Sequence, residues 1–321
     1  MLTDYVFKQA QGKTTGSTGR RRLDSEVFAK LEIPVPTNDK LNKTLELYQY
    51  ALKAKENKET NAKKLLSSID DFVLKELGIT LPKKNNDLNA RIFSTTLQKL
   101  TGNRFDPFYN QKYFSKLDEI IENSKYPTKP LSDLCYSVRG VTYSGNDEIQ
   151  DNNGFGIIRA NNITLKTNSL NFDEVRFIRK DSLVLNSQML KKGDILMSAA
   201  SGSKEHVGKV AFIDHDLPFY FGGFMSVLRC YEKEIIPEYL FFFLRSKIYR
   251  EVLFRVLGGT NINNLNFSMI SNFKIPLPSI EKQKDIATEA NRRRFEAQRL
   301  EKEAKETLEQ ARQEIEKIIL E

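Results

Sequence analysis

Cysteine and histidine, the residues that most often hold metals or act in catalysis, are scarce in this sequence of 321 residues, which has two of each. Cys135 and Cys230 lack the spacing of a metal-binding motif, and we expect two buried thiols rather than a disulfide. His206 and His215 are too few for a Cys/His metal cluster, and they give no support to a histidine-based triad. The sequence therefore indicates a protein without a metal site or a cofactor.

Long hydrophobic runs are also missing. The longest apolar stretch, residues 239–244, has six residues, whereas a membrane-spanning helix needs about 18. The first residues lack the apolar segment of a secretory signal. Hydrophobic residues make up 40% of the chain and charged residues 29%, as in globular proteins. We expect a soluble, cytoplasmic protein that has no membrane partner.

Motifs for nucleotide chemistry are missing as well. Residues 202–209 resemble a phosphate-binding loop, but the glycines are one residue too far apart, and Val210 replaces the magnesium-binding Ser or Thr. The sequence has neither the Gly-rich turn of a methyl-donor site nor the Asn-Pro-Pro-aromatic motif of an amino-methyltransferase. Asp194 and Glu205 could be read as nuclease carboxylates, but Asp194 follows Lys-Gly and is better explained as a turn residue. We expect no catalytic residue.

The positive charge is concentrated in the middle of the chain. Residues 81–278 contain 26 Lys and Arg against 20 Asp and Glu, whereas residues 37–80 and 279–321 are nearly neutral. A basic body suits a polyanion, because each phosphate that it neutralises releases counterions. Many proteins with a similar charge bind no nucleic acid, so the charge alone does not decide the partner.

Two segments of about 40 residues each have the periodicity of long helices. Their apolar residues recur every three or four positions and form the narrow seam of a coiled coil. At 1.5 Å per residue, each helix would span roughly 60 Å. The seam of the first helix would comprise Leu41, Leu45, Tyr48, Leu52, Lys55, Glu59, Ala62, Leu66, Ile69 and Val73, and that of the second Ala297, Leu300, Ala304, Leu308, Ala311, Ile315 and Ile318. We expect the two helices to form an antiparallel coiled coil.

A short internal repeat precedes the two helices. Residues 16–36 align with residues 258–278 without a gap, at a constant offset of 242 positions. Both copies end in Ile-Pro-X-Pro, which places the start of each helix after the prolines. Only the second copy has a whole domain in front of it. The first 37 residues therefore resemble the closing fragment of a domain of the same kind.

Residues 81–278 have the pattern of an α+β domain with loops rich in asparagine. Amphipathic stretches at 89–100 and 113–123 precede a series of short strands separated by Gly, Asn and Ser turns. A helix is expected to begin at Pro237 and to end before Gly258. The expected strands are residues 155–159, 175–178, 194–198, 207–213 and 219–228. The predicted fold is thus one mixed α/β domain flanked by two long helices.

Several motifs in a fixed order carry a family resemblance. They are Arg-Phe-Asp-Pro-Phe-Tyr at 104–109, Gly-Ile-Ile-Arg at 156–159, Leu-Lys-Lys-Gly-Asp-Ile-Leu-Met-Ser at 190–198, Gly-Lys-Val-Ala at 208–211, Pro-Glu-Tyr-Leu at 237–240, Gly-Gly-Thr at 258–260 and Ile-Pro-Leu-Pro at 275–278. None is specific alone. Together, over residues 85–321, they resemble the specificity (S) subunits of type I restriction-modification systems.

The resemblance implies a division into a terminal domain fragment (1–37), a first conserved helical region (38–80), a target recognition domain (81–278) and a second helical region (279–321). In that family, two recognition domains each read half of a split target in double-stranded DNA, and the helices set the spacing between the halves. The helices also bind methyltransferase (M) subunits, and a motor-nuclease (R) subunit joins for cleavage. Because the first recognition domain is reduced to a fragment here, it stays open whether the chain works alone, pairs with a second S chain or S fragment, or is a remnant.

Four loops could read DNA bases, because Arg bonds guanine and Asn bonds adenine in two-bond geometry and the module has nineteen Asn. Each loop lies beside an expected strand or helix end. The candidates for base contact are Tyr143, Ser144, Asn146, Arg159, Asn161, Asn162, Ser201, Ser203, Thr260, Asn261, Asn263 and Asn264. The candidates for phosphate contact are Arg139, Lys166, Lys204 and Lys209. The plainer interpretation is that Asn and Gly close turns and that the lysines are solvated.

Two other classes of function compete with a DNA-reading subunit. The first is a coiled-coil adaptor whose globular module binds a protein, and salt-dependent binding to duplex DNA would distinguish it. The second is a nuclease or methyltransferase in its own right, against which the missing methyl-donor and metal motifs argue. We therefore expect a non-catalytic DNA specificity subunit.

Overall fold

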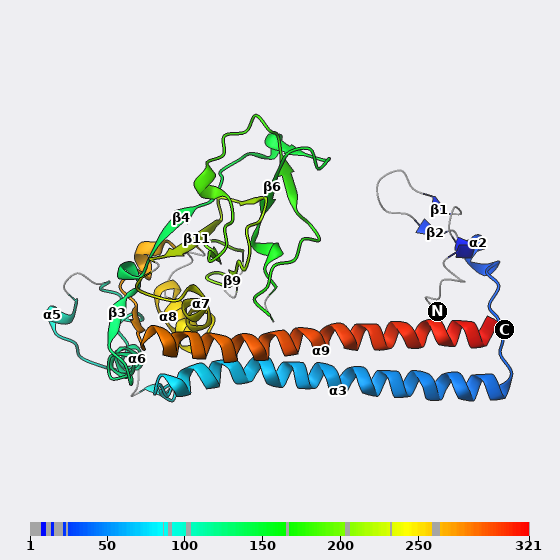
Figure 1. Ribbon diagram of the computed structural model, residues 1–321, viewed down its shortest axis with the longest axis horizontal. Helices are drawn as coiled ribbons and strands as arrows, with labels where there is room; N and C mark the ends of the chain where they lie inside the picture. Colours follow the sequence, from blue (N-terminus) through cyan, green and yellow to red (C-terminus); the bar gives the residue numbers. More distant parts are fainter. Residues whose placement is uncertain are drawn as a thin grey trace. The chain divides into compact units, whose positions relative to one another are not determined.

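The computed structural model describes residues 8–10, 14–15, 22–23, 25–85, 87–88, 92–100, 104–164, 167–202, 206–231, 233–258 and 264–320 (Figure 1). The chain is an α+β protein with two long helices, as the sequence predicts. It divides into two compact units, Met1–Leu65 with Phe295–Glu321, and Leu66–Arg294. This division cuts both long helices, whereas the boundaries expected at residues 37, 80 and 278 remain a prediction.

The long helices are α3 (Asn38–Glu76) and α9 (Ile280–Leu320). In the first unit they run antiparallel, and Lys58 Nζ lies 3.2 Å from Glu303 Oε2 and donates to Thr307 Oγ1. The same unit holds β1 (Thr14–Thr15), which pairs with β2 (Arg22–Leu23), and the short helix α2 (Ser25–Ala29). The contacts confirm the antiparallel coiled coil.

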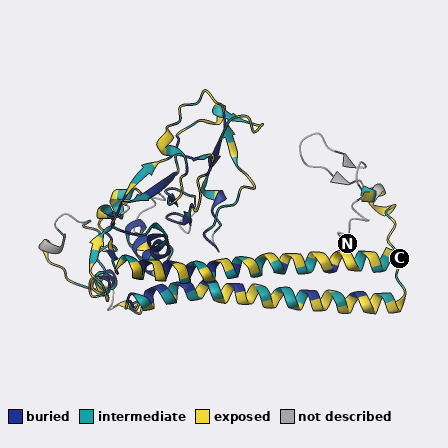
Figure 2. Cartoon of the chain, viewed as in Figure 1, coloured by how far each residue is buried: buried dark blue, intermediate teal, exposed yellow. Residues whose placement is uncertain are grey.

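The seam between the helices consists largely of small side chains. Ala62 and Ala297 are fully buried. Figure 2 shows exposed parts alternating with less exposed ones along both helices. The other alanines of the seam, Ala51, Ala304 and Ala311, are nearly or fully buried. Alanine permits the close helix approach that larger side chains would prevent, and it costs no rotamer entropy on burial. The alanines of the seam predicted for α9 are thus buried as expected, whereas Leu300, Leu308, Ile315 and Ile318 are only partly buried.

The seam predicted for the first turns of α3 is wrong. Leu41, Leu45 and Tyr48 are 51%, 52% and 40% exposed, whereas Thr44 and Ala51 are buried. The helix turns its small residues toward α9 and leaves the larger ones outside, because the alanine-rich seam of α9 favours a close approach. The prediction gave weight to large apolar residues and overlooked the small ones at neighbouring positions. From Ala62 to Val73 the predicted seam positions are buried.

In the second unit, the ends of the long helices join shorter helices. Arg293 of α9 donates to the carbonyl of Ser68, and its guanidinium carbon lies 4.6 Å from the ring centroid of Phe72. The shorter helices are α5 (Leu97–Leu100), α6 (Lys112–Glu122), α7 (Pro237–Leu244) and α8 (Lys247–Leu257). The helix expected from Pro237 onward is interrupted at Ser246, because the amide and the hydroxyl of Ser246 both donate to the carbonyl of Phe243.

The described residues of the second unit form three sheets. One has the order β4–β11–β8–β9 and is antiparallel throughout; another has the order β10–β6–β7–β5, with β10 and β6 parallel; the last pairs β12 with β3. The strands are β3 (Thr128–Pro130), β4 (Cys135–Arg139), β5 (Glu148–Ile149), β6 (Phe155–Ile158), β7 (Arg176–Ile178), β8 (Ile195–Ser198), β9 (Val210–Phe212), β10 (Phe219–Phe221), β11 (Met225–Cys230) and β12 (Lys274–Pro276).

The strand expected at 219–228 is two strands in two different sheets. The chain changes sheets at Gly222–Phe224, between β10 and β11. Gly140 lies against this switch, where a Cβ would come 2.2 Å from the carbonyl oxygen of Gly222, so only glycine fits there. The two sheets can therefore approach each other at this point.

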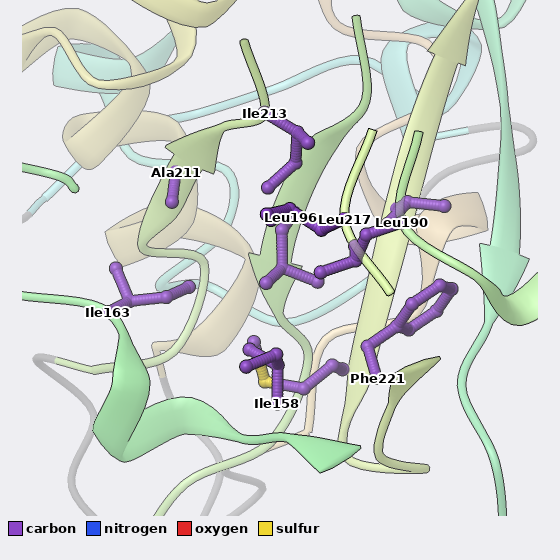
Figure 3. Packing of buried hydrophobic residues seen from close by; sticks show 10 residues of the cluster. Ile158, Ile163, Leu190, Leu196, Ala211, Ile213, Leu217 and Phe221 are labelled. Atoms are coloured by element: carbon purple, nitrogen blue, oxygen red, sulfur yellow. The ribbon is translucent and has the colours of Figure 1, made fainter. Parts of the chain in front are cut away.

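A hydrophobic core joins the two four-stranded sheets. Ile158 and Phe221 come from one sheet, Leu196 and Val227 come from the other, and all four are fully buried (Figure 3). Burial of each such side chain stabilises the fold by roughly 1.5–3 kcal/mol. Because the core ties the sheets together, the loops at their ends are held on a common base.

Polar groups at the sheet edge have structural roles. Asp194 forms a two-bond ion pair with Arg229, at 2.8 and 3.0 Å, and accepts a third bond from the amide of Lys191. The prediction of a turn residue is confirmed. Cys135 and Cys230 stand opposite each other on β4 and β11 as free thiols, as expected, although only Cys135 is fully buried and Cys230 is partly exposed. Burial raises the pKa of Cys135 to about 12.

Candidate nucleic-acid interface

Several of the loops chosen from the sequence border a cavity of about 500 Å³ in the second unit. Three of the four loops contribute to its lining through Tyr143, Arg159, Asn161 and Ser201. These loops start at the ends of strands from both four-stranded sheets. The full lining is Arg139, Val141, Thr142, Tyr143, Gly145, Glu148, Arg159, Ala160, Asn161, Ala200, Ser201, Gly202, Gly222, Gly223, Phe224 and Met225.

The fourth loop reaches the same place through its end. Asn264 forms an antiparallel bridge with Ala200, and the amide of Leu265 donates to the carbonyl of Ala199 at 2.6 Å. Asn264 itself is exposed. The candidates Lys166, Ser203, Lys204, Thr260, Asn261 and Asn263 lie outside the described residues.

The loop that begins at Tyr143 is fixed by its own polar groups. The carboxylate of Asp147 accepts bonds from the amide of Ser144 at 2.7 Å and from its hydroxyl at 2.8 Å. These bonds to Ser144 lower the pKa of Asp147 below its usual value. Asn146 stands exposed in the same 3₁₀ turn. The turn therefore presents Asn146 on a backbone that is already ordered.

Tyr143 and Arg159 bring donors to the cavity from two different loops. Burial, and then the nearby charge of Glu148, raise the pKa of the Tyr143 phenol, so the hydroxyl stays protonated at neutral pH. Arg159 is half-buried, and its Nε has no hydrogen-bond partner among the described residues. Arg159 also lines the cavity, which places its guanidinium where a ligand would bind.

Asn162 does not face the cavity, which corrects the expectation that it contacts a base. It is fully buried; its Oδ1 accepts from the amide of Arg159 at 2.9 Å, and its Nδ2 donates to the carbonyl of Asn171 at 3.1 Å. Its neighbour Asn161 is exposed and lines the cavity. Asn162 is therefore a positioning residue that holds the turn on which Arg159 and Asn161 stand.

Lys209 is likewise removed from the surface, which corrects its assignment as a phosphate contact. It is 3% exposed, its Nζ donates to the carbonyl of Ile163 at 3.0 Å, and burial lowers its pKa. The assignment of Arg139 as a phosphate contact stays a prediction. This arginine is exposed at the cavity, where its Nε donates to the carbonyl of Gly223 at 3.3 Å.

Sequence reasoning missed some of the lining residues, above all Thr142, Glu148 and Phe224. A usable signal for Phe224 was present, because Gly222-Gly223 interrupts an expected strand and marks a turn. For Thr142 and Glu148 the sequence offered no signal, since their place depends on the pairing of distant strands.

Metal or membrane features do not occur in the described part of the chain. Its helices include none long and apolar enough to cross a membrane. The described residues also contain no group of three or more His, Cys, Asp or Glu side chains that could hold a metal ion. The arrangement around the cavity is thus one of hydrogen-bond donors and acceptors on fixed loops.

Comparison with known proteins agrees with this picture. Residues 123–310, more than half of the chain, match the type I restriction modification DNA specificity domain. The chain is 37% identical over 166 residues to the StySPI specificity subunit of Salmonella potsdam and 36% identical over 162 residues to the EcoKI specificity subunit of Escherichia coli K12. These matches cover 50% and 49% of this chain and 35% and 34% of the relatives, so the matched segment spans about a third of their length.

A solved structure shares the fold. The S subunit of a type I restriction-modification system from M. genitalium aligns with a TM-score of 0.53 at 14% identity, over 98% of this chain and 71% of the other. This similarity extends over both long helices and the α+β module. The family match over more than half of the sequence identifies the chain as a member of the type I restriction modification DNA specificity domain family.

Proposed function

We propose that this chain is the specificity subunit of a type I restriction-modification system and binds one half-site in double-stranded DNA through the loops around the cavity. The observation that carries the proposal is the convergence of the Arg-, Asn- and Ser-bearing loops on one concave surface. Donors and acceptors on rigid loops are what base discrimination requires. Membership in the specificity family supports the same conclusion.

The proposed contacts follow the corrected geometry. Arg159 and Asn161 are the leading base contacts, because they share a turn that Asn162 holds in place. Arg139 is the leading phosphate contact, since it is a charged side chain at the rim. The other proposed base contacts are Tyr143, Ser144, Asn146, Ser201, Ser203, Thr260, Asn261, Asn263 and Asn264, with Lys166 and Lys204 at phosphates.

The chemistry is assigned to partner subunits. We infer that the chain catalyses nothing itself. A methyltransferase subunit acts on the DNA that this chain selects, and a motor-nuclease subunit joins for cleavage. In support, the relatives carry the name specificity subunit. Pairing with a second S chain or S fragment remains part of the proposal, to be tested by the mass of the purified complex.

A docking surface for the methyltransferase is proposed on α3. Leu41, Leu45 and Tyr48 form an apolar stripe that the coiled coil leaves exposed. Exchange of Leu41 and Leu45 for serine should abolish copurification with the methyltransferase, whereas Tyr50→Ser, at a residue 76% exposed on another face, should not. Unchanged copurification of the double variant would contradict this assignment.

The test of recognition begins with the full chain expressed together with its methyltransferase. Mapping of methylated sites gives the target, and binding of the complex is then compared on target and scrambled duplexes. We expect at least about 10³-fold tighter binding to the target, and affinity that falls with salt on both duplexes. Equal affinity for the two duplexes would contradict DNA recognition, and failure to bind either duplex even at low salt would favour the protein-binding adaptor.

A further inference from the structure

Phe224 is an apolar residue in a polar surrounding. Its side chain is 73% exposed, although it lies on the turn between β10 and β11 that lines the cavity. Single exposed hydrophobic residues are common on protein surfaces, so exposure alone assigns no function. The backbone at Phe224 adds the information that matters.

The backbone of Phe224 is fixed by a neighbouring loop. Its carbonyl oxygen accepts bonds from the amides of both Ala199 and Ala200, at 2.9 and 3.1 Å. The amide of Met225 donates to the carbonyl of Gly222 at 2.7 Å and closes the turn. The ring is thus presented to solvent from a rigid base, which lowers the entropy lost when it contacts a ligand.

Phe224 and its polar neighbours are suited to different recognition tasks. Arg139, Arg159, Asn161 and Ser201 line the same cavity and can read bases only through hydrogen bonds. The methyl group of thymine, which marks that base in the major groove, requires an apolar contact. Among the described lining residues, Phe224 is the large apolar side chain most open to solvent.

We propose that Phe224 contacts the 5-methyl group of a thymine in the major groove and thereby specifies thymine at one position of the half-site. This inference rests on the proposed DNA recognition and adds a named base and a residue that reads it. The contact needs no change in the backbone, because the turn is already ordered.

The test removes the methyl group without touching the protein. In the mapped target, each thymine is replaced in turn by deoxyuridine, and binding is measured for the complex of the full chain with its methyltransferase. We expect about fourfold weaker binding at one thymine, the loss that corresponds to one buried methyl group. Phe224→Ala should bind the thymine duplex at least about fourfold more weakly and should no longer distinguish deoxyuridine there.

Two further variants make the result specific. Phe224→Leu keeps an apolar side chain and should retain the preference for thymine. Leu183→Ala removes another apolar side chain, 87% exposed and outside the cavity lining, and should behave as the unchanged protein does.

Three outcomes would speak against the proposals, and they differ from one another. Sequence preference without sensitivity to any single deoxyuridine overturns the thymine contact and leaves DNA recognition standing. A thymine preference that persists in Phe224→Ala also overturns the contact. An equal loss of affinity on the thymine and deoxyuridine duplexes is one form of this outcome and would indicate a ring inserted between bases. Absence of any preference between target and scrambled DNA contradicts the proposed function itself.

Discussion

The coiled coil and the cavity region are built on opposite plans. In the coiled coil, one repeated contact between small side chains, such as Ala62 and Ala297, recurs along two helices. Around the cavity, two of the described loops are fixed by different side chains, one turn by Asp147 and another by Asn162. In the seam, many equivalent positions each accept few substitutions. Around the cavity, the residues that hold the loops are different from the residues that face the ligand.

The largest effect should come from a charge placed in the seam. Ala297→Asp buries an unpaired carboxylate at a fully buried position, and we expect the free energy of unfolding to fall by about 3–5 kcal/mol. Gln310→Asp adds the same charge at an exposed position of α9 and should change stability little. Thermal unfolding followed by circular dichroism compares them. Coincident melting curves would mean that the seam does not stabilise the chain.

A comparable loss is expected in the module when its buried ion pair is broken. Asp194→Ala leaves the Arg229 guanidinium, whose side chain is 14% exposed, without its carboxylate partner. We expect destabilisation by about 3 kcal/mol. Asp181→Ala, which removes a carboxylate 76% exposed from a surface pair with Arg179, is the control. Urea unfolding measures both, and similar midpoints would show that the pair contributes little.

Asn161 and Asn162 sharpen the comparison, because adjacent identical residues should behave differently. Asn162→Ala removes two buried hydrogen bonds and should destabilise the fold by about 1–3 kcal/mol. Asn161→Ala should leave unfolding unchanged and weaken binding to the target by about 1–3 kcal/mol, with nonspecific binding intact. Paired unfolding and DNA-binding curves test both statements. An equal loss of target binding and nonspecific binding in Asn161→Ala would remove it from the base-reading set.

The smallest effect is expected from the phosphate contact. Arg139→Gln should weaken binding to target and scrambled DNA by the same factor and reduce the slope of log affinity against log salt by about one. Arg179→Gln, whose side chain is 53% exposed and lies outside the cavity lining, should leave the slope unchanged. A change of base preference in Arg139→Gln would instead indicate that Arg139 reads a base.

The sequence predicted the elements that depend on local pattern. Helices α3 and α9, strand β6 and the turn role of Asp194 follow from periodicity, propensity or a short motif. The seam of α3 was missed at Leu41 because burial there depends on which residues α9 presents. A single sequence does not contain that information in its local pattern.

The candidate site could be predicted as a set of loops but not residue by residue. Asn, Ser and Gly marked loops that the structure brings together, since strand ends from two sheets meet there. Which of two adjacent asparagines turns inward depends on Asn171, nine residues away from Asn162. Gly222-Gly223 marked a turn before Phe224, but that this turn lines the cavity follows only from the change of sheets between β10 and β11.

The sheet change at Gly222–Phe224 has a consequence for how new specificities can arise. The backbone there is held by main-chain bonds and by the glycine at 140, none of which depends on the side chain at position 224. At position 161 the turn is likewise held by another residue, because the side chain of Asn162 accepts a bond from the amide of Arg159. Substitutions at such positions can change the surface offered to a ligand while the scaffold keeps its stability, so the molecule is suited to acquiring altered preferences through single exchanges.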